Sequence, residues 1–260
     1  MRTDGAIAVE RLMALQAVPG FTREVIGWQR GLPITFFHRD ASCGGAGRIC
    51  VSAGIHGDEA AGTCALVGLL AEGFDFCGLD AAIFPALSPD GLRAGSRTNF
   101  GGVDLNRDYR EPKTDEVRAH LEALSRLGQL DLGICLHEDW EAEGSYIYEN
   151  VKGHGAGMAD ELLGAMAAHI APDGRGEIDG MRAEGGIIRP NLKAEDFMEW
   201  PEAIFLWEKH CPAVYTLETP SGLRLEQRVE AHCAAVRIAC RLLIGERGHG
   251  AFSERDHSDR

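Results

Sequence analysis

The sequence predicts a single α/β domain in which helices flank a central sheet that is mixed and mostly parallel. Apolar runs of strand length alternate along the chain with amphipathic runs of helix length, which is the pattern of βα units. These apolar runs lack the polar alternation of a strand with one face in water, so they should be buried on both faces. A chain of 260 residues, 45% hydrophobic and 25% charged, can also bury one sizeable core.

The first part of the chain is expected to form a helix, a hairpin and a first βα unit. Arg30-Gly31-Leu32 joins two extended stretches, and a short turn between two such stretches indicates a β-hairpin. The expected elements are, in order, a helix at residues 6–16, extended stretches at 24–29 and 33–38, a buried strand at 49–55 and a helix at 60–71.

The same alternation of strands and helices continues through the rest of the chain. Thr114 can cap a helix that carries Asp115 and Glu116 in its first turn and ends at Gly128. A polar stretch at 171–199 is expected to be a long surface loop, and loops of that length are often functional. The other expected elements are a strand at 81–87, a Gly- and Asn-rich loop at 88–109, a strand at 130–136, a helix at 158–170, a helix from Pro201 through Lys209, a strand at 214–217 and a helix at 223–244.

Composition excludes several classes of function. The net charge of -14 comes from 40 acidic and 26 basic residues without a dense Lys/Arg stripe, which argues against a nucleic-acid partner. No apolar run approaches the roughly 20 residues that span a bilayer, and no export signal opens the sequence, so we expect a cytoplasmic protein without a membrane partner. Eight scattered cysteines without a Cys-x-x-Cys pair predict free thiols rather than disulfides or a thiolate metal site. Residues 1–246 are expected to form the domain and 247–260 a polar tail.

Three apolar strands end at residues that can carry chemistry, namely His56, His137 and Glu218. The carboxyl ends of the strands of a largely parallel sheet face the ligand crevice, so these side chains can converge. His56 and Glu59 form a His-x-x-Glu pair, and His137 can supply a third ligand, as a catalytic zinc site requires. Such a pair also occurs by chance, and His56 taken alone is more simply a structural histidine. A carboxylate in a turn after a buried strand is nevertheless costly unless it is paired or binds a metal.

A second polar segment, Asp104-Leu105-Asn106-Arg107 with Arg97 upstream, fits a solvated turn on its spacing alone. Taken with the strand ends, however, the sequence resembles the metallocarboxypeptidase family, which includes carboxypeptidases A and B and the bacterial murein peptide amidases. The resemblance rests on Ala53-Gly54-Ile55-His56-Gly57-Asp58-Glu59, on Ser88-Pro89-Asp90-Gly91 followed by Arg97-Thr98-Asn99 and Gly102-Val103-Asp104-Leu105-Asn106-Arg107, on the strand ending at His137, and on Tyr215-Thr216-Leu217-Glu218-Thr219-Pro220.

The resemblance implies a metallocarboxypeptidase-like catalytic domain over residues 1–246 that binds one Zn²⁺ per chain. His56, Glu59 and His137 would be its metal ligands, and Asp104 would orient His56. The remaining implied roles are a proton acceptor from water at Glu218, an oxyanion partner at Arg97 (with Arg93 as the less suitable alternative), and a binding site for the substrate carboxylate at Asn106 and Arg107.

The implied activity is hydrolysis of a peptide or amide bond next to a free carboxylate, with recycled cell-wall peptides as one example of a substrate. The alternative is an N-acyl amino acid deacylase of the aspartoacylase or succinylglutamate desuccinylase type, with an N-acyl amino acid as substrate. Those enzymes usually carry an added β-rich segment after the catalytic glutamate, whereas one helix is expected after Glu218 here. A binding module that has lost catalysis is a third possibility, which the presence of Glu218 beside a complete ligand set argues against.

Two features depart from the family. The loop at 171–199 lacks the tyrosine that closes over the substrate in pancreatic-type enzymes. Tyr146 or Tyr148 could approach the site instead, although we favour a structural role for both. The acidic run at 138–141 could shape a subsite, although we favour a solvated loop.

The specificity pocket should draw on residues 181–209. These mix basic residues (Arg182, Arg189, Lys193 and Lys209) with acidic ones, so the preference for a substrate side chain stays open.

Overall fold

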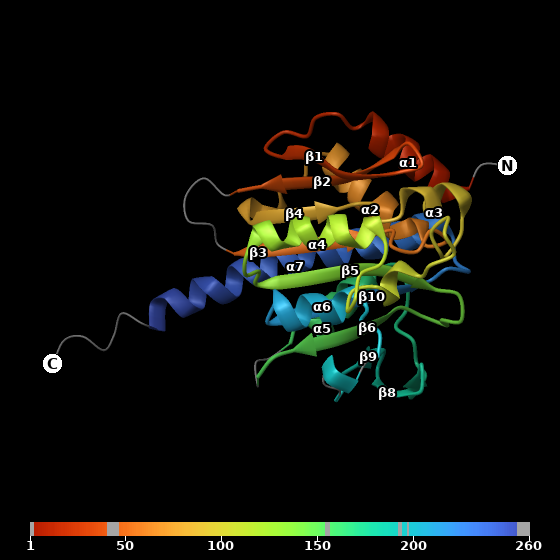
Figure 1. Cartoon of the computed structure of the whole chain (residues 1–260). Coiled ribbons are helices and arrows are strands. Elements are labelled where there is room, and N and C mark those ends of the chain that lie inside the picture. The colour runs from red at the N-terminus through yellow and green to blue at the C-terminus, as the bar shows by residue number, and fades with distance from the viewer. Residues whose placement is uncertain (1–2, 41–46, 154–156, 192–193, 197, 254–260) are drawn as a thin grey trace.

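A mixed β-sheet forms the centre of the molecule (Figure 1). The computed structural model describes residues 3–40, 47–153, 157–191, 194–196 and 198–253. Within these residues the sheet has ten strands in the order β1-β2-β4-β3-β5-β10-β6-β9-β8-β7. The strands are β1 (Thr22–Gln29), β2 (Leu32–Arg39), β3 (Arg48–Ala53), β4 (Asp80–Phe84), β5 (Leu132–Asp139), β6 (Tyr146–Val151), β7 (Glu177–Ile178), β8 (Met181–Glu184), β9 (Ile187–Ile188) and β10 (Ala213–Pro220).

The four central strands β4, β3, β5 and β10 run parallel to one another. Antiparallel strands adjoin them on both sides, with β2 next to β4 and β6 next to β10. The prediction of a mixed sheet flanked by helices is therefore confirmed, with four of the nine strand pairings among the described residues parallel. Strand β10, the last of the described strands, lies inside the sheet. Because these strands are parallel, the carboxyl ends of β3, β5 and β10 lie at the same end of the sheet, and the site residues lie at or just after those ends.

Helices cover both faces of the sheet, as Figure 1 shows. Helices α1 (Asp4–Ala14), α2 (Ala60–Ala71), α5 (Ala159–Met166) and α7 (Leu225–Ser253) pack on one face and share its hydrophobic core. Helices α4 (Asp115–Leu127) and α6 (Glu202–Lys209) contribute to the core on the other face. The short helix α3 (Pro89–Ala94) lies close to the turn that follows β3.

Local sequence signals explain the helices that match their expected ranges. Helix α2 has the predicted bounds and is buried around most of its circumference, between the sheet and its neighbours α1 and α7. Helix α4 begins after Thr114, whose hydroxyl accepts a hydrogen bond from the backbone N–H of Val117, and ends at Gly128 with a positive φ of 69°. Helix α4 thus has a local start and one apolar face, whereas α2 is enclosed by its neighbours on most sides.

The structure differs from the predictions mainly in the second half of the chain. Strand β6 was not expected, and the stretch at 171–199 contains the short strands β7, β8 and β9 instead of one long loop. The β7–β8 hairpin turns through Asp179-Gly180, both with positive φ, which is the backbone geometry of a tight hairpin turn. Helix α7 continues to Ser253, past the expected end at 244, so the polar tail begins as helix, while residues 254–260 lie outside the described residues.

Two broader expectations can also be compared with the structure. The seven described cysteines are free thiols, as predicted, and Cys43 lies outside the described residues. None of the described helices is both long enough and apolar enough to span a bilayer.

Candidate metal centre and catalytic cleft

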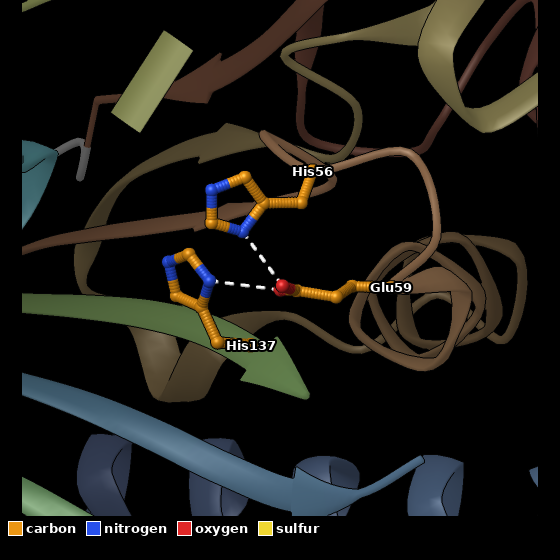
Figure 2. Close-up of side chains that lie close together, drawn as sticks. All are labelled: His56, Glu59 and His137. Carbon is orange, nitrogen blue, oxygen red and sulfur yellow. Dashed lines mark hydrogen bonds and ion pairs between the residues drawn. The ribbon is translucent and has the colours of Figure 1, made fainter. Parts of the chain in front are cut away.

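Three buried side chains meet at the carboxyl end of the parallel strands (Figure 2). His56 follows β3, Glu59 precedes the first residue of α2, and His137 belongs to β5. The Nδ1 atom of His56 lies 2.6 Å from Oε1 of Glu59, and Nδ1 of His137 lies 2.8 Å from Oε2 of the same carboxylate. One potential ligand atom from each residue lies within 4.8 Å of the others, so the three can share one ion.

Glycine allows the turn between His56 and Glu59 to pass close to α3. A Cβ on Gly57 would lie 1.9 Å from the carbonyl carbon of Gly91, and the backbone N–H of Gly57 donates to the carbonyl of Ser96. No side chain fits into this contact without a movement of the backbone. The glycine of the motif is therefore explained by packing, which fixes the direction of His56.

The charges around the three side chains favour a cation between them. Burial raises the pKa of Glu59, but the interactions with His137 and His56 outweigh it and hold that pKa well below its ordinary value. Burial lowers the pKa of His56, yet Asp104 and Glu59 raise it to about 9. Two carboxylates thus act on the imidazoles, and a divalent cation would neutralise the excess negative charge. Two imidazoles and one carboxylate are also a donor set that zinc enzymes use, so the residues fit this metal.

Asp104 and Arg97 surround His56 and Glu59 from the loop after α3. Oδ1 of Asp104 lies 3.1 Å from Nε2 of His56, on the opposite side of the ring from Glu59. Arg97 is about half exposed, and its guanidinium reaches both carboxylates, at 3.3 Å from Asp104 and 3.5 Å from Glu59. Asp104 also accepts a hydrogen bond from the backbone N–H of Asn106. The His56 ring is therefore held through both of its nitrogens.

Glu218 lies beside this cluster because of the register of three strands. It pairs with His137 on β5 and with Tyr146 on β6, and residues paired in this way project from the same face of a sheet. Its Oε2 atom is enclosed and has no hydrogen-bond partner among the described residues. Burial, then the charges of Glu59, Asp139, Asp179 and Glu138, raises the pKa of Glu218. This carboxyl therefore has a free acceptor site next to the candidate ligands.

A cavity with a volume of about 460 Å³ joins the cluster to the other predicted site residues. His56, Glu59, His137, Arg97, Asn106, Arg107 and Glu218 all line it, whereas Asp104 lies behind His56. Oδ1 of Asn106 accepts a hydrogen bond of 2.8 Å from the backbone N–H of Glu202, which leaves the amide NH₂ of Asn106 available to a ligand. Arg107 donates a hydrogen bond of 2.9 Å to the backbone carbonyl of Asn106. Like Arg97, it is an arginine that lines the cavity.

Residues to which the sequence assigned no catalytic role also line this cavity. The hydroxyl of Tyr146 donates to Asp139, and that of Tyr148 donates to Asp179 at the tip of the β7–β8 hairpin. Trp140 lines the same cavity and is 81% exposed. Both tyrosines thus contribute to the cavity wall, and the Asp-Gly pair at 179–180 was the sequence signal for the hairpin that brings Asp179 there.

The prediction of a solvated loop at 138–141 is wrong for Glu138. This residue is buried and forms an ion pair with Arg228 of α7, a partner 90 residues away. Two basic residues from the expected specificity region pair with acids at other places, Arg182 with Glu184 and Arg189 with Glu149 and Asp160. Lys193 lies outside the described residues.

Comparison with known proteins identifies the fold. No protein-family model matches the sequence, and no curated protein matches it. Among solved structures, a candidate metallopeptidase from Shewanella baltica superposes with a TM-score of 0.80 at 22% identity, covering 92% of this chain and 93% of that one. A metallo-carboxypeptidase from Pseudomonas aeruginosa in complex with (2-guanidinoethylmercapto)succinic acid gives 0.67 at 19% identity, over 93% and 68%. Murein-tripeptide amidase MpaA from Escherichia coli O157 gives 0.56 at 18% identity, over 87% and 94%.

These structural neighbours confirm the predicted architecture. The chain has the α/β fold of metallocarboxypeptidases along nearly its whole length. At identities below 25% the similarity concerns the fold, and the argument for an activity has to come from the residues of the cavity.

Proposed function

We propose that the protein is a zinc-dependent hydrolase of the carboxypeptidase or amidase type, which cleaves a peptide or amide bond next to a free carboxylate of a small substrate. The observation that carries the proposal is the composition of one cavity. It combines a His56–Glu59–His137 cluster, an unpaired carboxyl oxygen on Glu218 and the Asn106–Arg107 pair. These are the three functions that exo-acting hydrolysis needs, namely a metal, a base and an anchor for the terminal carboxylate.

His56, Glu59 and His137 would hold the metal, with Asp104 fixing the orientation of His56. A zinc ion in such a site lowers the pKa of a bound water to about 7 and polarises the scissile carbonyl. The remaining chemistry belongs to side chains of this protein.

Glu218 accepts the proton of the attacking water at its unpaired Oε2 and passes it to the leaving nitrogen. Arg97 stabilises the oxyanion that forms when water adds to the carbonyl, because its half-exposed guanidinium lies at the cavity wall next to Glu59. The Asn106 amide and the Arg107 guanidinium bind the substrate carboxylate. That anchor fixes which bond lies between the base and the metal ligands.

The experiment measures metal content and substrate class together. Zinc in the purified protein is quantified first, with one ion per chain expected. Dipeptides, cell-wall tripeptides and N-acyl amino acids are then tested, each as the free acid and as the carboxy-terminal amide. Faster cleavage of a peptide acid than of its amide supports the proposal, whereas cleavage of N-acyl amino acids alone would identify a deacylase.

The variant Glu218→Gln tests the assignment of the base. It should retain the zinc and lose most of the turnover, because glutamine has nearly the same shape but cannot accept the proton. Glu141→Gln is a suitable control, since Glu141 also lines the cavity but lies outside the proposed machinery. Full activity in Glu218→Gln would exclude the mechanism.

We also propose that the protein is cytoplasmic, because its described cysteines are free thiols, and cell fractionation can test this.

A further inference from the structure

The residue that begins helix α2 does not cap it. Glu59 occupies the N-cap position, where a side-chain oxygen commonly accepts a hydrogen bond from the second or third backbone N–H of the helix. Its carboxylate instead turns toward His56 and His137. The N–H of Ala61, the second residue of α2, donates to Oε1 of Glu138 at 2.6 Å. Glu138, which belongs to β5, thus provides the cap in place of Glu59.

The charge of Glu138 is balanced from a third element. Its side chain is fully enclosed, and Oε2 accepts a hydrogen bond from Nη1 of Arg228, a buried residue of α7. Nε of Arg228 donates to the backbone carbonyl of Leu223 at 3.0 Å, which holds the guanidinium in place. A buried carboxylate is tolerated when it is paired and hydrogen-bonded in this way.

Glu138 also lies between two candidate metal ligands. It directly follows His137 in β5, and its backbone N–H donates to Oε2 of Glu59 at 3.2 Å. Its side chain holds the start of α2, two residues after Glu59. The elements that carry Glu59 and His137 are therefore joined through one residue that is not itself one of the candidate ligands.

We propose that Glu138, supported by Arg228, is a positioning residue of the metal site. It caps α2 from the neighbouring strand, which frees the Glu59 carboxylate to act as a ligand and fixes its distance from His137. The proposal rests on the proposed function, because it requires that a metal binds between these residues.

The chain contains a matched control for this arrangement. Glu149 of β6 is also buried, accepts a hydrogen bond of 3.2 Å from the backbone N–H of Ala159 at the start of α5, and pairs with Arg189. It thus caps a helix from a strand and binds an arginine, as Glu138 does. It does not adjoin a candidate metal ligand, so its loss should affect stability without affecting the metal.

The experiment measures the zinc dissociation constant of the metal-free protein by competition with a chromophoric chelator, together with the melting temperature. Glu138→Leu removes the cap, and we expect zinc affinity to fall by about 10- to 100-fold, the usual effect of losing a residue that orients metal ligands. Glu138→Asp keeps the charge but is too short to reach Ala61, so it should also weaken zinc binding. Glu149→Leu should lower the melting temperature with a zinc affinity within about twofold of wild type.

A rescue variant distinguishes a positioning role of Glu138 from a general loss of stability. Its zinc affinity also provides a test if Glu138→Leu does not fold. In Glu138→Gln combined with Arg228→Met, the amide oxygen can still accept from Ala61 and no buried charge is left unpaired. Its zinc affinity should return to within a few fold of wild type, while that of Glu138→Asp stays low. Equal zinc affinity in wild type and Glu138→Asp, or an equal loss in Glu149→Leu, would overturn the proposal. A wild-type protein that binds no zinc would overturn the metal site and this proposal together.

Discussion

Replacing Glu202 with glutamine should make the stability of the protein less dependent on pH. Glu202 begins α6 and is 1% exposed, and its Oε1 atom has no hydrogen-bond partner within the described part of the chain. The nearby Nε2 of His120 lies 3.9 Å away, but burial lowers the pKa of that histidine to about 3, so it is neutral above pH 5. Burial raises the pKa of Glu202 to about 7, against the smaller lowering effects of Ser52 and Cys135.

The sign and size of the effect follow from this shift. Below the unfolded-state pKa of 4.5 the carboxyl is protonated in both states, and its contribution to stability is fully present. That contribution is lost as the pH rises toward 7, because the folded protein must either hold an ionised carboxylate in its core or retain a proton that the unfolded chain has already released. A shift of about 2.5 units corresponds to about 3.4 kcal/mol at high pH, of which about 2.5 kcal/mol develops between pH 5 and pH 8.

Urea unfolding of the metal-free protein measures this directly at pH 5, 6, 7 and 8. Working without metal removes the separate pH dependence of metal binding. The free energy of unfolding of Glu202→Gln minus that of wild type should increase by about 2.5 kcal/mol over this range. Glu122→Gln on the exposed surface of α4 is the control and should show no such trend. A difference for Glu202→Gln that is flat, or that decreases with pH, would refute the assignment of a buried, neutral carboxyl.

Two further predictions concern the metal site. Asp104→Asn should weaken zinc binding by about 10- to 100-fold in chelator competition, because asparagine cannot balance the charge of the His56 ring, and an unchanged affinity would contradict that role. Gly57→Ala should lower both the melting temperature and the zinc affinity, since the added Cβ would lie 1.9 Å from the backbone of Gly91. Gly68→Ala in α2 is its control, because the added Cβ meets no described atom within 4 Å, and it should change stability by no more than about 1 kcal/mol. Equal effects of the two glycine substitutions would show that crowding at Gly57 is not the cause.

The parts of the fold that follow from nearby residues were predictable. Helix α4 matches its expected range because its Thr114 cap and its apolar face are local properties of the sequence. Helix α2 also has its expected range, although its cap comes from Glu138 of β5. The parallel centre of the sheet followed from apolar runs that end in polar residues, and the structure brings His56, His137 and Glu218 into one cavity at those strand ends.

The parts that depend on distant partners were not predictable. Strand β6 is short, and its main partner is β10, more than 60 residues later in the chain. Strands β7 and β9 have two residues each, which is too short for any periodicity to show. Glu138 was expected in a solvated loop because acidic neighbours favour exposure, whereas its partners Ala61 and Arg228 lie 77 and 90 residues away. A pairing over such distances leaves no pattern in a single sequence.

The position of β10 has a consequence for how the protein is made. As the ribosome releases the chain, β5 and β6 emerge early, but they do not pair with each other in the finished sheet, since β10 lies between them. The position between β5 and β6 in the nascent protein therefore has to stay unfilled until β10, which ends at residue 220, has emerged. Glu218 arrives on the same strand, so the chain acquires its complete set of cavity carboxylates only when the sheet closes. Slow non-local pairing makes this closure the step most exposed to misfolding.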